Sequence, residues 1–266
     1  MLALLAVYLA VGAVAGLLAG LFGVGGGLVI VPMLVFVLGR EGVAPEHLMH
    51  LALGTSMASI VFTSVASARA HHARGAVRWE IVRGVAPGIV AGTFAGTFLA
   101  ARLATRPLKG FFVAFLCFVA WQMLTGRKPR PARELPGAAG MSGAGGVIGA
   151  VSSLVGIGGG TLSVPFMLWC NVPAHHAVGT SAAIGFPIAV AGTAGYLVNG
   201  WGVPGLPPRS LGFVLLPALA GIVVASVLTA PLGARLAHGL PVERLKRAFA
   251  LLLVLLAARM AWGLFS

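Results

Sequence analysis

The chain has 266 residues, of which 59% are hydrophobic and only 9% are charged, and its mean hydropathy is +1.01. Soluble domains carry about 25% charged residues, so this composition excludes a water-facing surface and indicates an integral membrane protein. The net charge of +13 does not indicate nucleic-acid binding here, because the Lys and Arg residues stand in loops and at the ends of apolar segments, as the positive-inside rule predicts.

The chain contains a series of stretches without charged residues, most of them about as long as a membrane-spanning helix: 1–39, 51–68, 84–101, 110–126, 135–174, 177–208, 210–234 and 248–258. Because a crossing needs about 20 apolar residues, most of them predict one membrane helix each. The range 2–22 is expected to be the first membrane helix rather than a cleaved signal, since no Lys or Arg precedes Arg40. The stretches 1–39 and 135–174 are too long for one straight crossing, so each must be broken. We predict an all-α integral membrane protein of about 8–10 transmembrane segments.

Glycines interrupt both long stretches. Residues 20–32 read GLFGVGGGLVIVP, and residues 153–165 read SLVGIGGGTLSVP. Glycine permits backbone angles that other residues avoid, and irregular backbone survives at membrane depth only if it is buried or lines a cavity. A helix that restarts after such a turn offers free N–H groups to an anion. Close helix packing through small residues is the alternative interpretation.

The two segments belong to an internal repeat with a shift of 133 positions, and LGTS at 53–56 also matches VGTS at 178–181. This divides the chain into an N-terminal membrane repeat (1–124), a basic, Pro-rich linker (125–138) and a C-terminal membrane repeat (139–266). If the repeats are inverted, 12 Lys and Arg lie on the side of the linker and 5 opposite; if they are parallel, the numbers are 9 and 8. The positive-inside rule favours inverted-topology repeats with a cytoplasmic linker and both termini outside.

Candidate site residues come from the glycine breaks and from the hydroxyl residues beside them. Hydroxyls of the Thr-Ser pairs either donate to an anion or bond the preceding helical turn. The predicted substrate-binding residues are Gly23, Gly25, Gly26, Gly27, Thr55, Ser56, Gly156, Gly158, Gly159, Gly160, Thr161, Thr180 and Ser181. His50 and His175 match at a shift of 125, and contact with substrate or with a proton is weighed for them against a surface role.

The residue types that the chain lacks indicate the sign of the charge on the ligand. The chain has no Asp, and its five Glu lie in predicted loops, so a buried-carboxylate cation site is not expected. No metal or cofactor is predicted, because the histidines lack carboxylate or thiol partners at ligand spacing. An enzyme is not expected either, since no Ser/His/Asp set can form and residues 54–56 are not a G-x-S-x-G elbow. Backbone N–H groups and hydroxyls remain as donors, and they suit an anion.

The doubled G-x-G-G-G-x-x-x-x-P pattern and the two G-T-S elements resemble the TauE/SafE family of membrane anion transporters over essentially the whole chain. The resemblance implies transport of a sulfur-containing anion such as sulfite or an organosulfonate across the bacterial inner membrane. We favour a secondary carrier that works by alternating access. An anion channel and a membrane assembly factor without a transported ligand are the alternative interpretations. The expected partners are a small anion and the lipid bilayer but no nucleic acid, and the sequence leaves open whether the chain forms a homo-oligomer.

Overall fold

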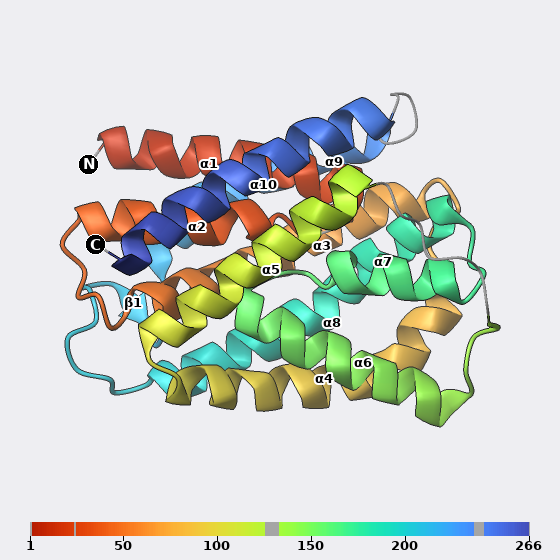
Figure 1. Cartoon of the computed structure of the whole chain (residues 1–266), viewed down its shortest axis with the longest axis horizontal. Helices are drawn as coiled ribbons and strands as arrows, with labels where there is room; N and C mark the ends of the chain where they lie inside the picture. Colours follow the sequence, from red (N-terminus) through yellow and green to blue (C-terminus); the bar gives the residue numbers. More distant parts are fainter. Residues whose placement is uncertain (1, 24, 126–132, 237–241, 266) are drawn as a thin grey trace.

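The protein is almost entirely helical (Figure 1). The computed structural model describes residues 2–23, 25–125, 133–236 and 242–265. The helices of the first repeat are α1 (Leu2–Phe22), α2 (Gly27–Arg40), α3 (Leu48–His72), α4 (Trp79–Arg102) and α5 (Thr105–Thr125). Those of the second are α6 (Ala138–Val155), α7 (Gly160–Trp169), α8 (Ala174–Gly200), α9 (Leu216–Leu236) and α10 (Val242–Phe265). Two short antiparallel strands, β1 (Ser210–Leu211) and β2 (Val214–Leu215), lead into α9.

Eight of the described helices are long and apolar enough to cross a membrane, while α2 and α7 are shorter. Large apolar side chains stand exposed on the outer helices, including Val147, Leu228 and Leu255, each about two-thirds exposed or more. Such surface is stable against lipid and not against water. The predicted fold class, an all-α membrane protein of about 8–10 segments, is confirmed.

Both long apolar stretches are broken where the sequence predicts. Helix α1 ends at Phe22 and α2 starts at Gly27, while α6 ends at Val155 and α7 starts at Gly160. In Figure 1, α1 and α6 run in opposite directions along the long axis of the molecule, and so do α3 and α8. Of the predicted linker 125–138, residues 126–132 lie outside the described residues.

The helices of the two repeats interleave. Helix α1 packs along α9, and α6 packs along α4, so the first helix of each repeat lies against the fourth helix of the other. Glycines allow this close approach. A side chain at Gly12 would collide with the backbone of Ile222 in α9, and one at Gly145 would collide with the backbone of Val85 in α4. Since Gly12 and Gly145 are 133 positions apart, the repeat is preserved in these packing contacts.

Helices α3 and α8 pack against each other at the centre, where they are the most buried of the eight long helices. Their buried faces are lined with small and hydroxyl residues as well as with apolar ones. Placing both helices in the interior sets the two Thr-Ser pairs beside the two glycine breaks.

Candidate functional site

The two glycine turns match in backbone angle at their first and last glycines, although Gly25 has a φ of +78° and its counterpart Gly158 has no positive φ. Gly23 and Gly156, which follow α1 and α6, have φ angles of +66° and +69°. Gly26 and Gly159, which precede α2 and α7, have φ angles of +78° and +77°. Residues with a Cβ rarely adopt positive φ, so these four glycines are required by the path of the backbone.

The turns also meet each other. A Cβ added to Gly25 would lie 3.0 Å from both Cα and N of Gly158, and one added to Gly27 would collide with the carbonyl of Gly156. A Cβ on Gly185 of α8 would lie 3.3 Å from the carbonyl oxygen of Gly158. Any side chain at Gly25 or Gly27 would therefore push the turns apart. Close approach between turns, as well as backbone angle, explains why both runs are glycine.

The Thr-Ser pairs connect each central helix to the opposite repeat. The Ser56 hydroxyl of α3 donates to the Gly156 carbonyl at 2.8 Å. In the matching place, the Ser181 hydroxyl of α8 donates to Val178 at 2.7 Å and lies 3.4 Å from the Gly23 carbonyl. The start of each turn is thus in contact with the central helix of the other repeat.

The two threonines act as acceptors. The Thr55 hydroxyl oxygen accepts a hydrogen bond from the Leu215 N–H at 2.9 Å, just before α9. The Thr180 oxygen accepts one from the Arg78 N–H at 3.0 Å, just before α4. All four hydroxyls of the two Thr-Ser pairs therefore have protein partners in this conformation.

A second pair of contacts holds the carbonyls just before the turns. The Tyr196 hydroxyl of α8 donates to the Ser153 carbonyl at 2.8 Å. At the positions shifted by 133 and 125, His71 Nε2 of α3 lies 3.0 Å from the Gly20 carbonyl. Carbonyls at the ends of helices lack intrahelical partners, and these side chains supply them. A histidine therefore takes in the first repeat the place that a tyrosine takes in the second.

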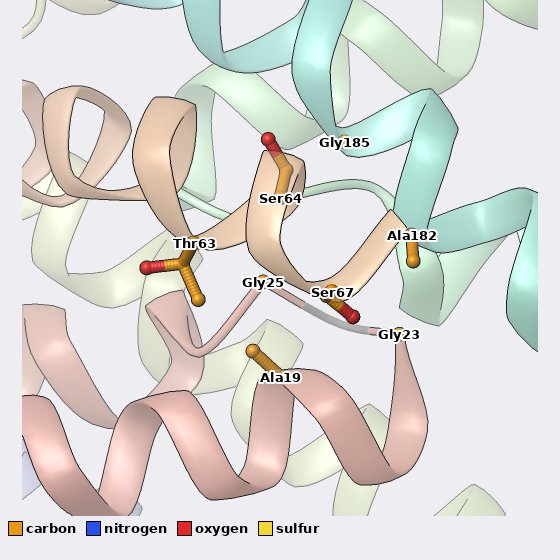
Figure 2. Close-up of a pocket in the computed structure, with 8 residues that line it drawn as sticks. All are labelled: Ala19, Gly23, Gly25, Thr63, Ser64, Ser67, Ala182 and Gly185. Atoms are coloured by element: carbon orange, nitrogen blue, oxygen red, sulfur yellow. The ribbon is translucent and has the colours of Figure 1, made fainter. Parts of the chain in front are cut away.

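A small pocket lies where the first turn faces the central helices (Figure 2). It is lined by Ala19, Gly23, Gly25, Thr63, Ser64, Ser67, Ala182 and Gly185. As bounded by the described residues, it leaves no room for a whole water molecule. Figure 2 shows the Ser67 hydroxyl on the side facing Gly23. This side chain is 2% exposed, and its hydroxyl has no hydrogen-bond partner within the described part of the chain.

Thr161 and Gly160 form the first turn of α7 on the other side of the junction. The Thr161 hydroxyl is buried and, as far as the described residues extend, has no hydrogen-bond partner; the same holds for Ser152 and Ser163 close by in the chain. Buried hydroxyls without a partner are uncommon, and a ligand is one of the explanations for them. The second repeat therefore also offers donors near its turn.

The two candidate histidines lie away from this junction, and neither lines the pocket. His50 is buried at the start of α3, with Nδ1 3.2 Å from the Glu46 carbonyl and Nε2 3.0 Å from the Ala100 carbonyl. His175 is exposed in the first turn of α8, where its ring lies 4.0 Å from that of His176. Within the described residues, no group of three His, Cys, Asp or Glu side chains is arranged to hold a metal.

The sequence analysis did not single out Thr63, Ser64 and Ser67. A signal for them exists, because Ser56, Ser59, Thr63 and Ser67 recur at helical spacing within one charge-free stretch. The second repeat carries no matching signal, because positions 188, 189 and 192, which match 63, 64 and 67 at the shift of 125, are Ile, Ala and Gly. The hydroxyls that line this pocket therefore come from the first repeat only.

Comparison with known proteins covers nearly the whole chain. The model of the family described as "Sulfite exporter TauE/SafE" matches residues 8–260. A probable membrane transporter protein of Haemophilus influenzae is 40% identical over 253 residues, which are 95% of this chain and 96% of that protein.

More distant relatives carry the same description. A probable membrane transporter protein of Methanocaldococcus jannaschii is 26% identical over 251 residues, 88% of this chain and 87% of that protein. One of Bacillus subtilis is 26% identical over 241 residues, 88% of this chain and 90% of that protein. No solved structure gives a significant match.

Proposed function

We propose, because the chain belongs to the TauE/SafE sulfite exporter family, that this multi-pass membrane transporter carries a small sulfur-containing oxyanion across the bacterial inner membrane. Sulfite, a sulfonate or a related oxyanion is the substrate class. The observation that carries this proposal is the meeting of two glycine turns near the starts of α2 and α7. Beside them lies the buried Ser67 hydroxyl, which has no hydrogen-bond partner among the described residues. Helix N-termini and hydroxyls are donors for an oxyanion.

The substrate would lie between the two turns, in contact with Gly25 and Gly158 and with the hydroxyls next to them. In this conformation the turns are in contact and the pocket has no room for a whole water molecule. The pocket is lined from α1, the first turn, α3 and α8, so a substrate would enter by the separation of some of these elements. We propose transport by alternating access, in which opening occurs along the seam between α3 and α8.

The repeats 1–124 and 139–266 are proposed to be inverted, with the 125–138 linker in the cytoplasm. The opposite directions of α1 and α6 and of α3 and α8 in Figure 1 support this, as does the excess of basic residues on the side of the linker.

The moving bodies would not coincide with the repeats. Helix α9 packs on α1 and α3, and α4 packs on α6 and α8. One body would therefore contain α1, α2, α3 and α9, and the other α4, α6, α7 and α8. Each body takes its fourth helix from the other repeat. The seam between them would run along the α3–α8 contact and the contact between the two turns, while α5 and α10 pack on each other outside both bodies.

Uptake into liposomes holding the purified protein tests the proposal, with sulfite, sulfate, sulfoacetate and taurine as the panel and protein-free liposomes as the control. Saturable uptake of at least one sulfur oxyanion is expected. Flux that never saturates would instead favour an anion channel. No uptake and no thermal stabilisation by any of the four would favour an assembly factor, since a saturating ligand stabilises a folded protein by about 2.7 kcal/mol at 100 times its Kd.

A further inference from the structure

Positively charged side chains gather where α2 and α10 end and α5 begins, away from the glycine turns. These three helix ends lie at the same end of the molecule in Figure 1. Arg40 is the last residue of α2, Arg259 lies near the end of α10, and Lys109 lies near the start of α5. The Lys109 ammonium donates to the Gly263 carbonyl, one helical turn beyond Arg259. Each of the three cations therefore comes from a different helix.

The two arginines share one aromatic ring. The guanidinium carbon of Arg40 lies 4.3 Å from the centroid of the Phe36 ring, and that of Arg259 lies 4.4 Å from the same centroid. The contact with the ring favours each arginine separately, but two like charges held this close together repel each other. A negative group near both guanidiniums would offset that repulsion.

No carboxylate among the described side chains supplies this negative charge. Both ion pairs found among those side chains belong to other basic residues, so neither Arg40 nor Arg259 has a carboxylate oxygen within 4.0 Å there. Glu41 follows Arg40 in the chain, but its carboxylate accepts a hydrogen bond from the Tyr8 hydroxyl at 3.4 Å. An anion from outside the chain would balance the two arginines.

An exposed apolar stripe of α10 leads to the arginine pair. Leu251, Leu255, Arg259 and Trp262 follow one another at spacings of four, four and three residues, so they lie on one face of the helix. Leu251 is 59% exposed, Leu255 69% and Trp262 77%. Exposed leucines of a membrane helix contact acyl chains, and tryptophan is enriched at the level of the lipid headgroups. Apolar surface followed by positive charge matches the order of acyl chain and phosphate in a phospholipid.

We propose that an anionic phospholipid binds at the Arg40–Arg259 pair, with its phosphate between the two guanidiniums and an acyl chain along Leu251 and Leu255. A guanidinium presents parallel N–H donors that match phosphate oxygens. An anionic lipid also brings a net negative charge, which a zwitterionic lipid lacks, and basic clusters at the membrane surface attract such lipids. The bound lipid would join α10 to α2, since the two arginines belong to these helices. This site is separate from the pocket beside the first turn and does not depend on the transported ion.

Binding of phosphatidylglycerol and of phosphatidylcholine with the same acyl chains tests the proposal on the purified full-length protein in detergent. Native mass spectrometry counts the bound lipids, and thermal unfolding gives the stabilisation by each lipid. We expect phosphatidylglycerol to bind with the lower Kd and to raise the Tm more. Equal Kd and equal stabilisation for the two lipids would overturn the proposal.

Glycerophosphoglycerol, the headgroup of phosphatidylglycerol without acyl chains, separates a lipid site from a site for a soluble phosphate. We expect it to stabilise the protein much less than the whole lipid does at the same concentration. Equal stabilisation would show that the arginine pair binds a free phosphate and would overturn the assignment to a lipid.

Arg40→Ala and Arg259→Ala should each raise the Kd for phosphatidylglycerol about tenfold or more, because hydrogen bonds to a charged group are lost. Arg133→Ala is the matched control. The Arg133 guanidinium lies 5.0 Å from the centroid of the Trp169 ring, the counterpart of Phe36 at the shift of 133, and no second arginine of the described residues lies over that ring. This control should keep the wild-type Kd. An equal rise in all three variants would indicate attraction to the net charge of the protein and would overturn the site.

Leu255→Asn tests the contact with the acyl chain. It should raise the Kd for phosphatidylglycerol, while Val147→Asn, which changes a side chain of α6 that is 67% exposed, should not. Equal Kd values of these two variants would remove the α10 stripe from the site. If Arg259→Ala does not fold, Arg259→Lys, which keeps the positive charge, should still prefer phosphatidylglycerol to phosphatidylcholine, and loss of this preference would contradict the assignment.

Discussion

Contact between the two glycine turns can be measured by adding one methyl group. Gly25→Ala places a Cβ at a φ of +78° and 3.0 Å from backbone atoms of Gly158. Gly42→Ala makes the same change at a φ of +79°, where the added Cβ has no described atom within 4 Å. Both variants lose about 1–2 kcal/mol because an L residue is forced into the left-handed region. Only Gly25→Ala also overpacks a buried contact, which costs a further 1–3 kcal/mol or so.

SDS-induced unfolding in detergent micelles would give the two free energies of unfolding, and the difference between them isolates the contact from the backbone strain. We expect Gly25→Ala to be less stable than Gly42→Ala by about 1–3 kcal/mol. We also expect Gly25→Ala to lose most of its transport in liposomes while Gly42→Ala keeps it. Equal stability and equal transport of the two variants would refute the reasoning, because the turns would then not be in functional contact.

Two further predictions concern the helix packing. In a background without the native cysteines, a disulfide between Met57→Cys and Gly192→Cys should stop transport by locking α3 to α8, because a Gly192 Cβ would lie 2.9 Å from the Met57 sulfur. As the control, the pair Tyr8→Cys and Gly221→Cys joins α1 to α9 within one body and should leave transport intact. The opposite result would show that the moving contact lies between α1 and α9 and not between α3 and α8. Tyr196→Phe should lower the free energy of unfolding by about 1–3 kcal/mol, because the buried Ser153 carbonyl loses the hydroxyl that donates to it at 2.8 Å. Tyr8→Phe should cost less, since the hydrogen bond from the Tyr8 hydroxyl to the Glu41 carboxylate is 3.4 Å long. Equal losses of the two variants in SDS unfolding would count against this prediction.

The breaks in the first and sixth helices follow from local properties. A charge-free stretch of 39 residues exceeds one crossing, and a run such as Gly25-Gly26-Gly27 marks where it turns. Positive φ at Gly23 and Gly26 is a property of single residues, so it can be anticipated from composition. The eight long helices are predictable for the same reason, since an apolar segment must satisfy its backbone hydrogen bonds internally in lipid.

The roles of the hydroxyls could not be predicted. The sequence leaves open whether Thr55 and Ser56 hold an anion or the protein, and both have protein partners in this conformation. Those partners, Gly156 and Leu215, are 100 or more residues away. Which hydroxyl stays unpartnered depends on these distant atoms, so Ser67 becomes a candidate only in the folded chain.

The sequence by itself determined the membrane class and the positions of the two glycine turns, because hydropathy, charge and backbone freedom act over one or a few helical turns. Only the tertiary structure decided that α1 lies on α9 and α4 on α6, that Gly25 touches Gly158, and that the pocket forms beside the first turn. Helix packing in lipid depends on how small residues on two distant surfaces fit together. That fit depends on both segments of a pair, so it cannot be predicted from the sequence of either segment alone.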